Sequence, residues 1–145
     1  MKTKYFGEMT FSENDIFTFD NGIFGFENNK KFALMNFEDG TDAMVCLQSV
    51  EDENLAFVLM NPFFLMSDYQ PELRAQDIRS LEIDKDTKGV LYYVVCVVQE
   101  NMVESTVNLR CPVVINPETK KAVQVILENN SYAFKHPLYK FNRGV

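Results

Sequence analysis

The 145-residue sequence has no tryptophan, a single histidine and only three cysteines, and these shortages restrict its chemistry. Cys46, Cys96 and Cys111 lie far apart without a C-x-x-C pair, which argues against a zinc site or a disulfide framework. We interpret all three as small buried hydrophobic residues. One histidine, His136, supplies too few ligands for a metal centre, and no G-x-S-x-G setting accompanies it. We therefore predict no metal, no cofactor and no catalytic residue.

Long apolar runs are also missing. No stretch approaches the roughly 18 apolar residues of a transmembrane helix, and the N-terminus has no continuous apolar centre typical of a signal peptide. We expect a cytoplasmic protein without membrane contact. The glycines at Gly22 and Gly25 fit neither G-x-x-x-x-G-K-[ST] nor G-x-G-x-x-G, so a phosphate loop is not indicated. Asn21-Gly22 instead predicts a turn.

Positive charge is in deficit, with 14 basic against 21 acidic residues and a net charge of −7. This balance argues against direct binding of nucleic acid, because phosphate contacts need a basic surface. A basic protein is the more natural partner, since opposite charges speed association. The alternative function is a barrel that binds single-stranded nucleic acid through exposed aromatic side chains.

What the chain does contain is short β-rich segments at near-regular spacing, which predict an all-β domain with minor α content. We expect one antiparallel β-barrel or sandwich over residues 1–145, with a single short helix at 72–83. Acidic residues at 38–42 predict a turn. The segment 89–98 is apolar without alternation, so we expect both of its faces to be buried. The predicted strands are 2–6, 8–11, 16–19, 31–37, 44–47, 55–60, 89–98, 106–111, 113–116 and 122–127.

The stretch 44–66 organises this pattern. Two apolar runs flank the acidic segment 48–54, which indicates a hairpin with a long connection. Pro62 then stops strand pairing just as the chain becomes very apolar, at Phe63 and Phe64. Such a segment either packs under the core or contacts a partner.

A second polar set lies on one face of a predicted strand. Thr106, Asn108 and Arg110 alternate with apolar residues, and Asn116 follows on the next strand. The guanidinium of Arg110 suits a carboxylate, either on a partner or within the domain at Glu51 or Asp52. The sequence leaves both readings open.

Several short motifs follow one another over residues 4–138. They are Tyr5-Phe6-Gly7, Phe19-x-Asn21-Gly22-Ile23-x-Gly25-Phe26-Glu27, Leu47-Gln48-Ser49-Val50-x-Asp52, Leu55-Ala56-Phe57-Val58, Asn61-Pro62-Phe63, Thr106-Val107-Asn108-Leu109-x-x-Pro112-x-x-Ile115-Asn116, Gln124-Val125-Ile126-Leu127 and His136-Pro137-Leu138. In this order and at these spacings the set resembles the bacterial flagellar assembly factor family, FliW. Phe24 departs from the proline common in the family's turn, and Cys111 departs from the usual alanine; we interpret both positions as structural.

The resemblance implies a non-catalytic, barrel-like domain with two protein partners. One is flagellin before its export, held in a chaperone-like complex. The other is the carbon storage regulator CsrA, an RNA-binding dimer whose repression of flagellin translation the family relieves. Flagellin's export-competent ends are amphipathic helices, so we expect an apolar groove or patch, with residues 62–69 as part of it.

The contact residues that we predict fall in three sets chosen for expected exposure. The acidic connection contributes Glu51, Asp52 and Asn54; the apolar loop contributes Pro62, Phe63, Phe64 and Tyr69; the polar strand face contributes Asn108, Arg110 and Asn116. The sequence does not say which set meets which partner.

Overall fold

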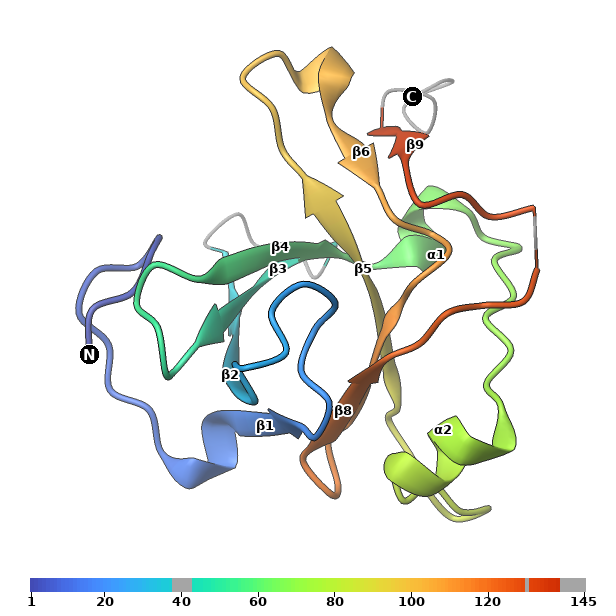
Figure 1. The fold of residues 1–145 in the computed structure, drawn as a ribbon, viewed down its shortest axis with the longest axis horizontal. Coiled ribbons are helices and arrows are strands. Elements are labelled where there is room, and N and C mark those ends of the chain that lie inside the picture. Colours follow the sequence, from blue (N-terminus) through green and yellow to red (C-terminus); the bar gives the residue numbers. More distant parts are fainter. Residues whose placement is uncertain (38–42, 130, 139–145) are drawn as a thin grey trace.

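The strands of the protein form one strongly curved sheet in a computed structural model, which describes residues 1–37, 43–129 and 131–138 (Figure 1). The predicted turn at 38–42 lies outside these described residues. The elements in chain order are η1 (Glu13–Asp15), β1 (Ile16–Phe19), β2 (Lys31–Asn36), β3 (Met44–Ser49), β4 (Ala56–Met60), α1 (Pro62–Leu65), α2 (Ala75–Ser80), β5 (Leu91–Val97), η2 (Met102–Glu104), β6 (Thr106–Val107), β7 (Val113–Asn116), β8 (Lys121–Gln124) and β9 (His136–Pro137).

Seven of these strands close into a barrel, in the order β4-β3-β2-β1-β8-β7-β5, with β5 pairing back onto β4. This confirms the predicted all-β barrel. The pairings are antiparallel except for β1 and β8, which run parallel through Thr18 and Phe19. A ring of strands that alternates direction throughout needs an even number of members, so a seven-stranded barrel requires one parallel neighbour. Among the described strands, the barrel is thus antiparallel, as predicted, at every neighbouring pair but this one.

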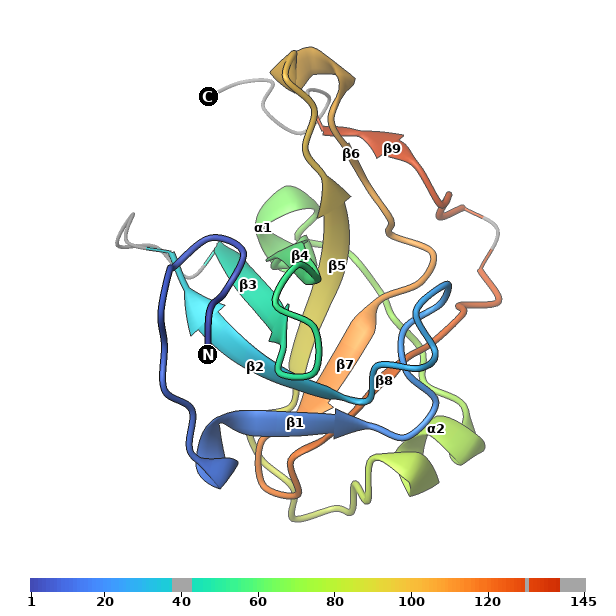
Figure 2. The same cartoon turned by 60° about the vertical axis from the view of Figure 1, so that its left-hand side comes forward.

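β5 is the strand on which the fold depends. Its first half pairs with β7, its second half with β4, and its last residues with β6. The β5–β6 hairpin therefore rises out of the barrel as an arm, and β9 extends the sheet on the outer side of β6 (Figure 2).

Two apolar clusters lie on opposite faces of the barrel wall. Tyr93, Val113 and Ile115 point into the barrel interior with Phe19, Phe32 and Leu47, while Val94 and Val114 point outward. The outward cluster is covered by the chain around Tyr69, Leu81 and Tyr132. Both faces of β5 are thus buried in its middle, as its lack of alternation predicts, but Val97 and Val98 at its end are exposed.

The helices differ from the prediction of a single short helix at 72–83. That helix spans only Ala75–Ser80, because Arg74 is its N-cap with Asp77 as its partner, and Glu82 just beyond it has a positive φ of 56°. A further helical turn, α1, occupies Pro62–Leu65, where the side chain of Asn61 accepts from the Phe63 amide. Proline at the first helical position favours this start, so the sequence did carry a signal for it.

The N-terminal strands predicted at 2–6 and 8–11 are not formed. Residues 1–9 make a tight turn with one isolated bridge between Lys2 and Glu8, and Gly7 takes a positive φ of 68°. The Thr3 amide donates to the Gly7 carbonyl across 2.8 Å, which folds the segment on itself and removes it from the sheet. The predicted strand 106–111 pairs only over Thr106–Val107, although burial still alternates as far as Cys111.

Candidate functional site

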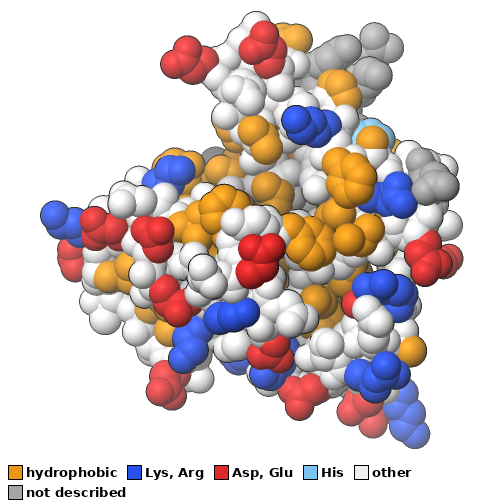
Figure 3. Space-filling model, viewed as in Figure 1, with side chains coloured by type: hydrophobic (Ala, Val, Ile, Leu, Met, Phe, Trp, Pro, Cys, Tyr) orange, Lys and Arg blue, Asp and Glu red, His pale blue; other side chains and the backbone are white. Residues whose placement is uncertain are grey.

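A groove of about 650 Å³ opens on the barrel face beside the rising arm, where orange side chains gather in Figure 3. Six parts of the chain meet there: the N-terminal turn, the 20–27 loop, the paired strands β4 and β5, the arm, the end of β8 with the residues after it, and the C-terminal stretch before β9. The groove is lined by Tyr5, Ile23, Phe24, Phe26, Ala56, Phe57, Val58, Val95, Cys96, Val97, Val98, Thr106, Asn108, Cys111, Gln124, Ile126, Phe134 and Lys135.

Most of this lining is apolar and in contact with solvent. Phe24, Phe26 and Ile126 are exposed, and Phe134 keeps 56% of its surface exposed. Phe26 packs edge-on against Phe57 with 5.2 Å between ring centroids, so the groove floor continues into the barrel interior. Exposed apolar surface gathered in one concave place marks an interaction site in a folded domain.

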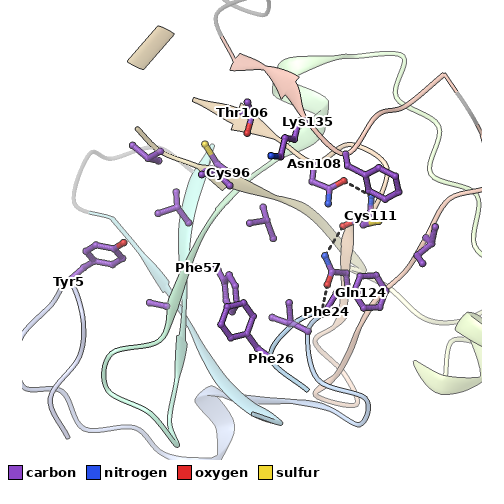
Figure 4. Close-up of a pocket in the computed structure, with 18 residues that line it drawn as sticks. Tyr5, Phe24, Phe26, Phe57, Cys96, Thr106, Asn108, Cys111, Gln124 and Lys135 are labelled. Carbon is purple, nitrogen blue, oxygen red and sulfur yellow. Dashed lines mark hydrogen bonds between the residues drawn. The ribbon is translucent and has the colours of Figure 1, made fainter. Parts of the chain in front are cut away.

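The 20–27 loop holds the aromatic wall of the groove in place. Gly22 has a φ of +67°, and a Cβ atom there would lie 2.6 Å from the Glu27 Cα, so no other residue fits without a shift. The Gln124 side chain fixes the loop from the other side: its Oε1 accepts from the Phe24 amide across 3.0 Å (Figure 4). Its Nε2 donates to the Cys111 carbonyl across 3.2 Å. The predicted turn at Asn21-Gly22 therefore shapes the groove.

Charge is sparse around the groove. Lys135 is the one charged side chain among the described residues that line it. Arg110 lies close by, with its guanidinium 5.7 Å from the centroid of the Phe134 ring, and it donates to the carbonyls of Leu127 and Tyr132. The charges of Lys135 and Arg110 are opposite in sign to the net charge of −7 of the whole chain.

The internal alternative for Arg110, a salt bridge to Glu51 or Asp52, was wrong. The Glu51 carboxylate accepts instead from the backbone amides of Lys31 and Lys30, and these hydrogen bonds lower the pKa of Glu51. The acidic connection is exposed at the end of the β3–β4 hairpin, with Asp52 and Asn54 beside Glu51. These three predicted residues do lie together on the surface.

The predicted apolar loop divides into buried and exposed members. Pro62 is buried, and Tyr69 is buried with its hydroxyl donating to the Leu109 carbonyl across 2.6 Å. Phe63 is exposed while packing edge-on against Tyr69 and Tyr92, and Phe64 is 68% exposed. Pro62 and Tyr69 therefore follow the core interpretation of this segment, while contact of Phe63 and Phe64 with a partner stays a prediction.

The polar strand face also divides. Asn108 lines the groove, and its Oδ1 accepts from the Cys111 amide across 3.0 Å. Asn116 is fully buried, and its Nδ2 donates to the Leu81 carbonyl across 2.8 Å. Asn116 therefore ties the end of α2 to the barrel and presents no surface to a partner.

Sequence reasoning missed most of the groove. Phe24 and Phe26 flank Gly25 in a predicted turn, and bulky apolar residues in a turn are the signal that could have pointed to an interaction site. Ile126 and Phe134 gave no such signal, because nothing local distinguishes them from core residues. The groove depends on pairings between strands that are distant in the sequence.

The three cysteines are buried and unpaired, as interpreted from the sequence. Burial raises the pKa of the Cys46 thiol from 9.0 to about 11, so the folded state favours the protonated form. The stability that this thiol contributes is present below pH 9 and is lost as the pH rises toward 11.

We expect the urea midpoint of a Cys46→Ala variant to fall less than that of the wild type between pH 8 and pH 11. Equal losses in both proteins would contradict this assignment.

Within the described ranges, no cluster of three or more histidine, cysteine, aspartate or glutamate side chains is placed to hold a metal ion. The same part of the chain contains no helix long and apolar enough to span a membrane.

The geometry defines a class of protein: a small seven-stranded β-barrel that presents an open apolar groove, an architecture suited to holding another molecule. The family model described as FliW protein matches residues 1–138. The chain belongs to the FliW family of flagellar assembly factors. That family is not a known enzyme family.

Individual relatives agree along nearly the whole chain. The flagellar assembly factor FliW of Thermosipho africanus is 38% identical over 136 residues, which cover 94% of this chain and 93% of the relative. Its counterpart from Syntrophus aciditrophicus is 39% identical over 140 residues, or 97% of this chain and 87% of the relative. A crystal structure of a flagellar assembly factor FliW superposes with a TM-score of 0.87 at 36% identity, covering 95% of both chains.

Proposed function

We propose that this flagellar assembly factor holds flagellin before export and also binds the regulator CsrA, relieving its repression of flagellin translation. The observation that carries the proposal is the groove, a solvent-open apolar hollow of about 650 Å³ that the fold builds from six separate parts of the chain. A groove of this character suits an apolar segment of a partner polypeptide.

The two partners call for surfaces of different chemistry. The apolar groove suits flagellin, whose apolar ends need cover before export. The acidic end of the β3–β4 hairpin, with Glu51, Asp52 and Asn54 exposed, suits a basic RNA-binding protein. Phe63 and Phe64 on α1 are further candidate contacts, because they are exposed apolar side chains, but they lie outside the groove lining and after the end of β4 that is opposite to the acidic connection. A docked acidic protein also weakens phosphate binding by repulsion, in keeping with release of RNA.

Calorimetric titration of the purified chain with flagellin and, separately, with CsrA tests the proposal. We expect saturable binding in both titrations, with the CsrA titration weakening as salt rises because it depends on charge. Adding CsrA in excess to the flagellin complex, or the reverse, measures whether one partner displaces the other.

Two flat titrations at tens of micromolar would contradict the proposed function. A gel shift of single-stranded RNA by the chain alone at low salt would favour the alternative, a nucleic-acid-binding barrel. We expect no shift, because the net charge is −7.

A further inference from the structure

The barrel closes through a short seam. β4 and β5 pair only through Val58–Cys96, Leu59–Val95 and Met60–Val94, whereas β3 and β4 pair through five residues each. Both strands continue beyond the seam but on different neighbours: β4 stays with β3 as far as Ala56, and β5 turns away with β6 to form the arm. β4 and β5 therefore separate beyond the Val58–Cys96 pair, and the groove lies in the split between them.

The register shows which backbone groups the split leaves without a partner. The Ser49 amide donates to the Leu55 carbonyl, so alternation along the β3–β4 ladder points the backbone of Ala56 and Val58 away from β3. The Asn108 amide donates to the Val95 carbonyl, so the backbone of Cys96 and Val98 points away from β6. If the pairing of β4 with β5 continued, Ala56 and Val98 would form its next hydrogen-bonded pair. The two strands separate before this point, so the pair is not formed.

Val98 is the more open of the two positions. Its side chain is 47% exposed and lines the groove, and neither its amide nor its carbonyl hydrogen-bonds to another described residue. It is the first residue after β5, on the arm, beyond the last residue of β5 that β4 covers. Unpaired backbone groups beside the apolar groove are suited to an added strand of another polypeptide. Main-chain hydrogen bonds to that strand provide affinity, and the groove accommodates its alternate side chains.

We propose that the groove captures a partner segment in extended conformation, as a strand added to the edge of β5 at Val98, in the place that β4 vacates. The segment has apolar side chains at alternate positions, which face Phe26, Phe57 and the rest of the groove lining. It carries a carboxylate toward Lys135, because that is the one charge among the described lining residues. The inference rests on the proposed function, since it takes flagellin as the source of the segment, and it replaces the amphipathic helix expected from the family resemblance.

A proline at position 98 tests this mode of binding. Val98→Pro removes the amide hydrogen that points to the edge, and it breaks no hydrogen bond among residues 1–37, 43–129 and 131–138. Val98→Ala removes side-chain surface but keeps the amide, so it is the matched control. We expect Val98→Pro to bind full-length flagellin at least about 10-fold more weakly than Val98→Ala does. Melting temperatures of both variants verify that the barrel is intact.

Amide exchange of Val98 measured by NMR supplies a second readout. A bound strand protects this amide from exchange with solvent, whereas a helix lying in the groove leaves it unbonded. Equal flagellin affinities of the two variants, or an unprotected Val98 amide in the flagellin complex, would overturn the strand mode while leaving flagellin binding itself in place. A wild-type chain that does not bind flagellin would contradict the proposed function, and the inference would fail with it.

Discussion

Phe26→Asp is expected to weaken flagellin binding by about 100-fold, equivalent to roughly 2.7 kcal/mol. Phe26 lies on the aromatic wall of the groove, where its ring packs against Phe57. A carboxylate in its place loses water when an apolar segment covers it, and burying a charge without a partner is costly. Titration of flagellin into the variant by calorimetry measures the effect.

Ile78→Asp is the matched control for that substitution. Ile78 is 38% exposed on α2, close to the 42% of Phe26, and it does not line the groove. We expect this variant to bind flagellin within about twofold of the wild type. Both variants should keep CsrA binding, because the acidic hairpin is a separate surface. Equal weakening of flagellin binding by Ile78→Asp and Phe26→Asp would show that the groove is not the flagellin surface.

Gly22→Ala is expected to destabilise the fold by about 2–4 kcal/mol and to abolish the groove as a binding surface. The backbone of Gly22 has a φ of +67°, which costs a residue with a Cβ atom roughly 1–2 kcal/mol by itself. The added carbon would also lie 2.9 Å from the Glu27 carbonyl oxygen, so the 20–27 loop must open. Denaturant unfolding and flagellin titration measure the two consequences.

Gly25→Ala in the same loop measures the cost of the backbone conformation without the steric contact that Gly22→Ala makes with Glu27. Gly25 has a φ of +88°, but no atom lies within 4 Å of a Cβ built there. We expect a loss of only about 1–2 kcal/mol and a groove that still binds flagellin. A Gly25→Ala variant as unstable as Gly22→Ala would contradict the argument that the contact with Glu27 dominates.

The strands of the barrel could be predicted from local patterns because each depends on its own side chains. The hairpin of β3 and β4, the hairpin of β7 and β8, and the two-faced burial in the middle of β5 all follow from apolar runs and turn residues. The prediction failed at residues 1–11, where β-forming side chains are present but Gly7 folds the segment on itself. Propensity does not decide pairing when a tight turn competes for the same backbone groups.

The candidate contact residues also include some that the sequence placed correctly and one that it did not. Glu51, Asp52 and Asn54 were placed correctly at the surface, since an acidic connection between strands has to stay hydrated. Asn116 was chosen as a surface residue, yet it is buried beneath α2 because its amide satisfies the Leu81 carbonyl. No local pattern distinguishes an asparagine that bonds a distant backbone from one that faces water.

The sequence by itself determined the β class, the turn at Gly22, the family, and the shortage of metal-binding and catalytic side chains, because each depends on composition or on neighbours along the chain. Only the tertiary structure decided where the groove lies. Its walls come from segments that are distant in the sequence, such as those of Phe24 and Gln124, which are 100 residues apart. Its open side exists because β4 and β5 part after Val58 and Cys96, which follows from how the seven strands close around their core.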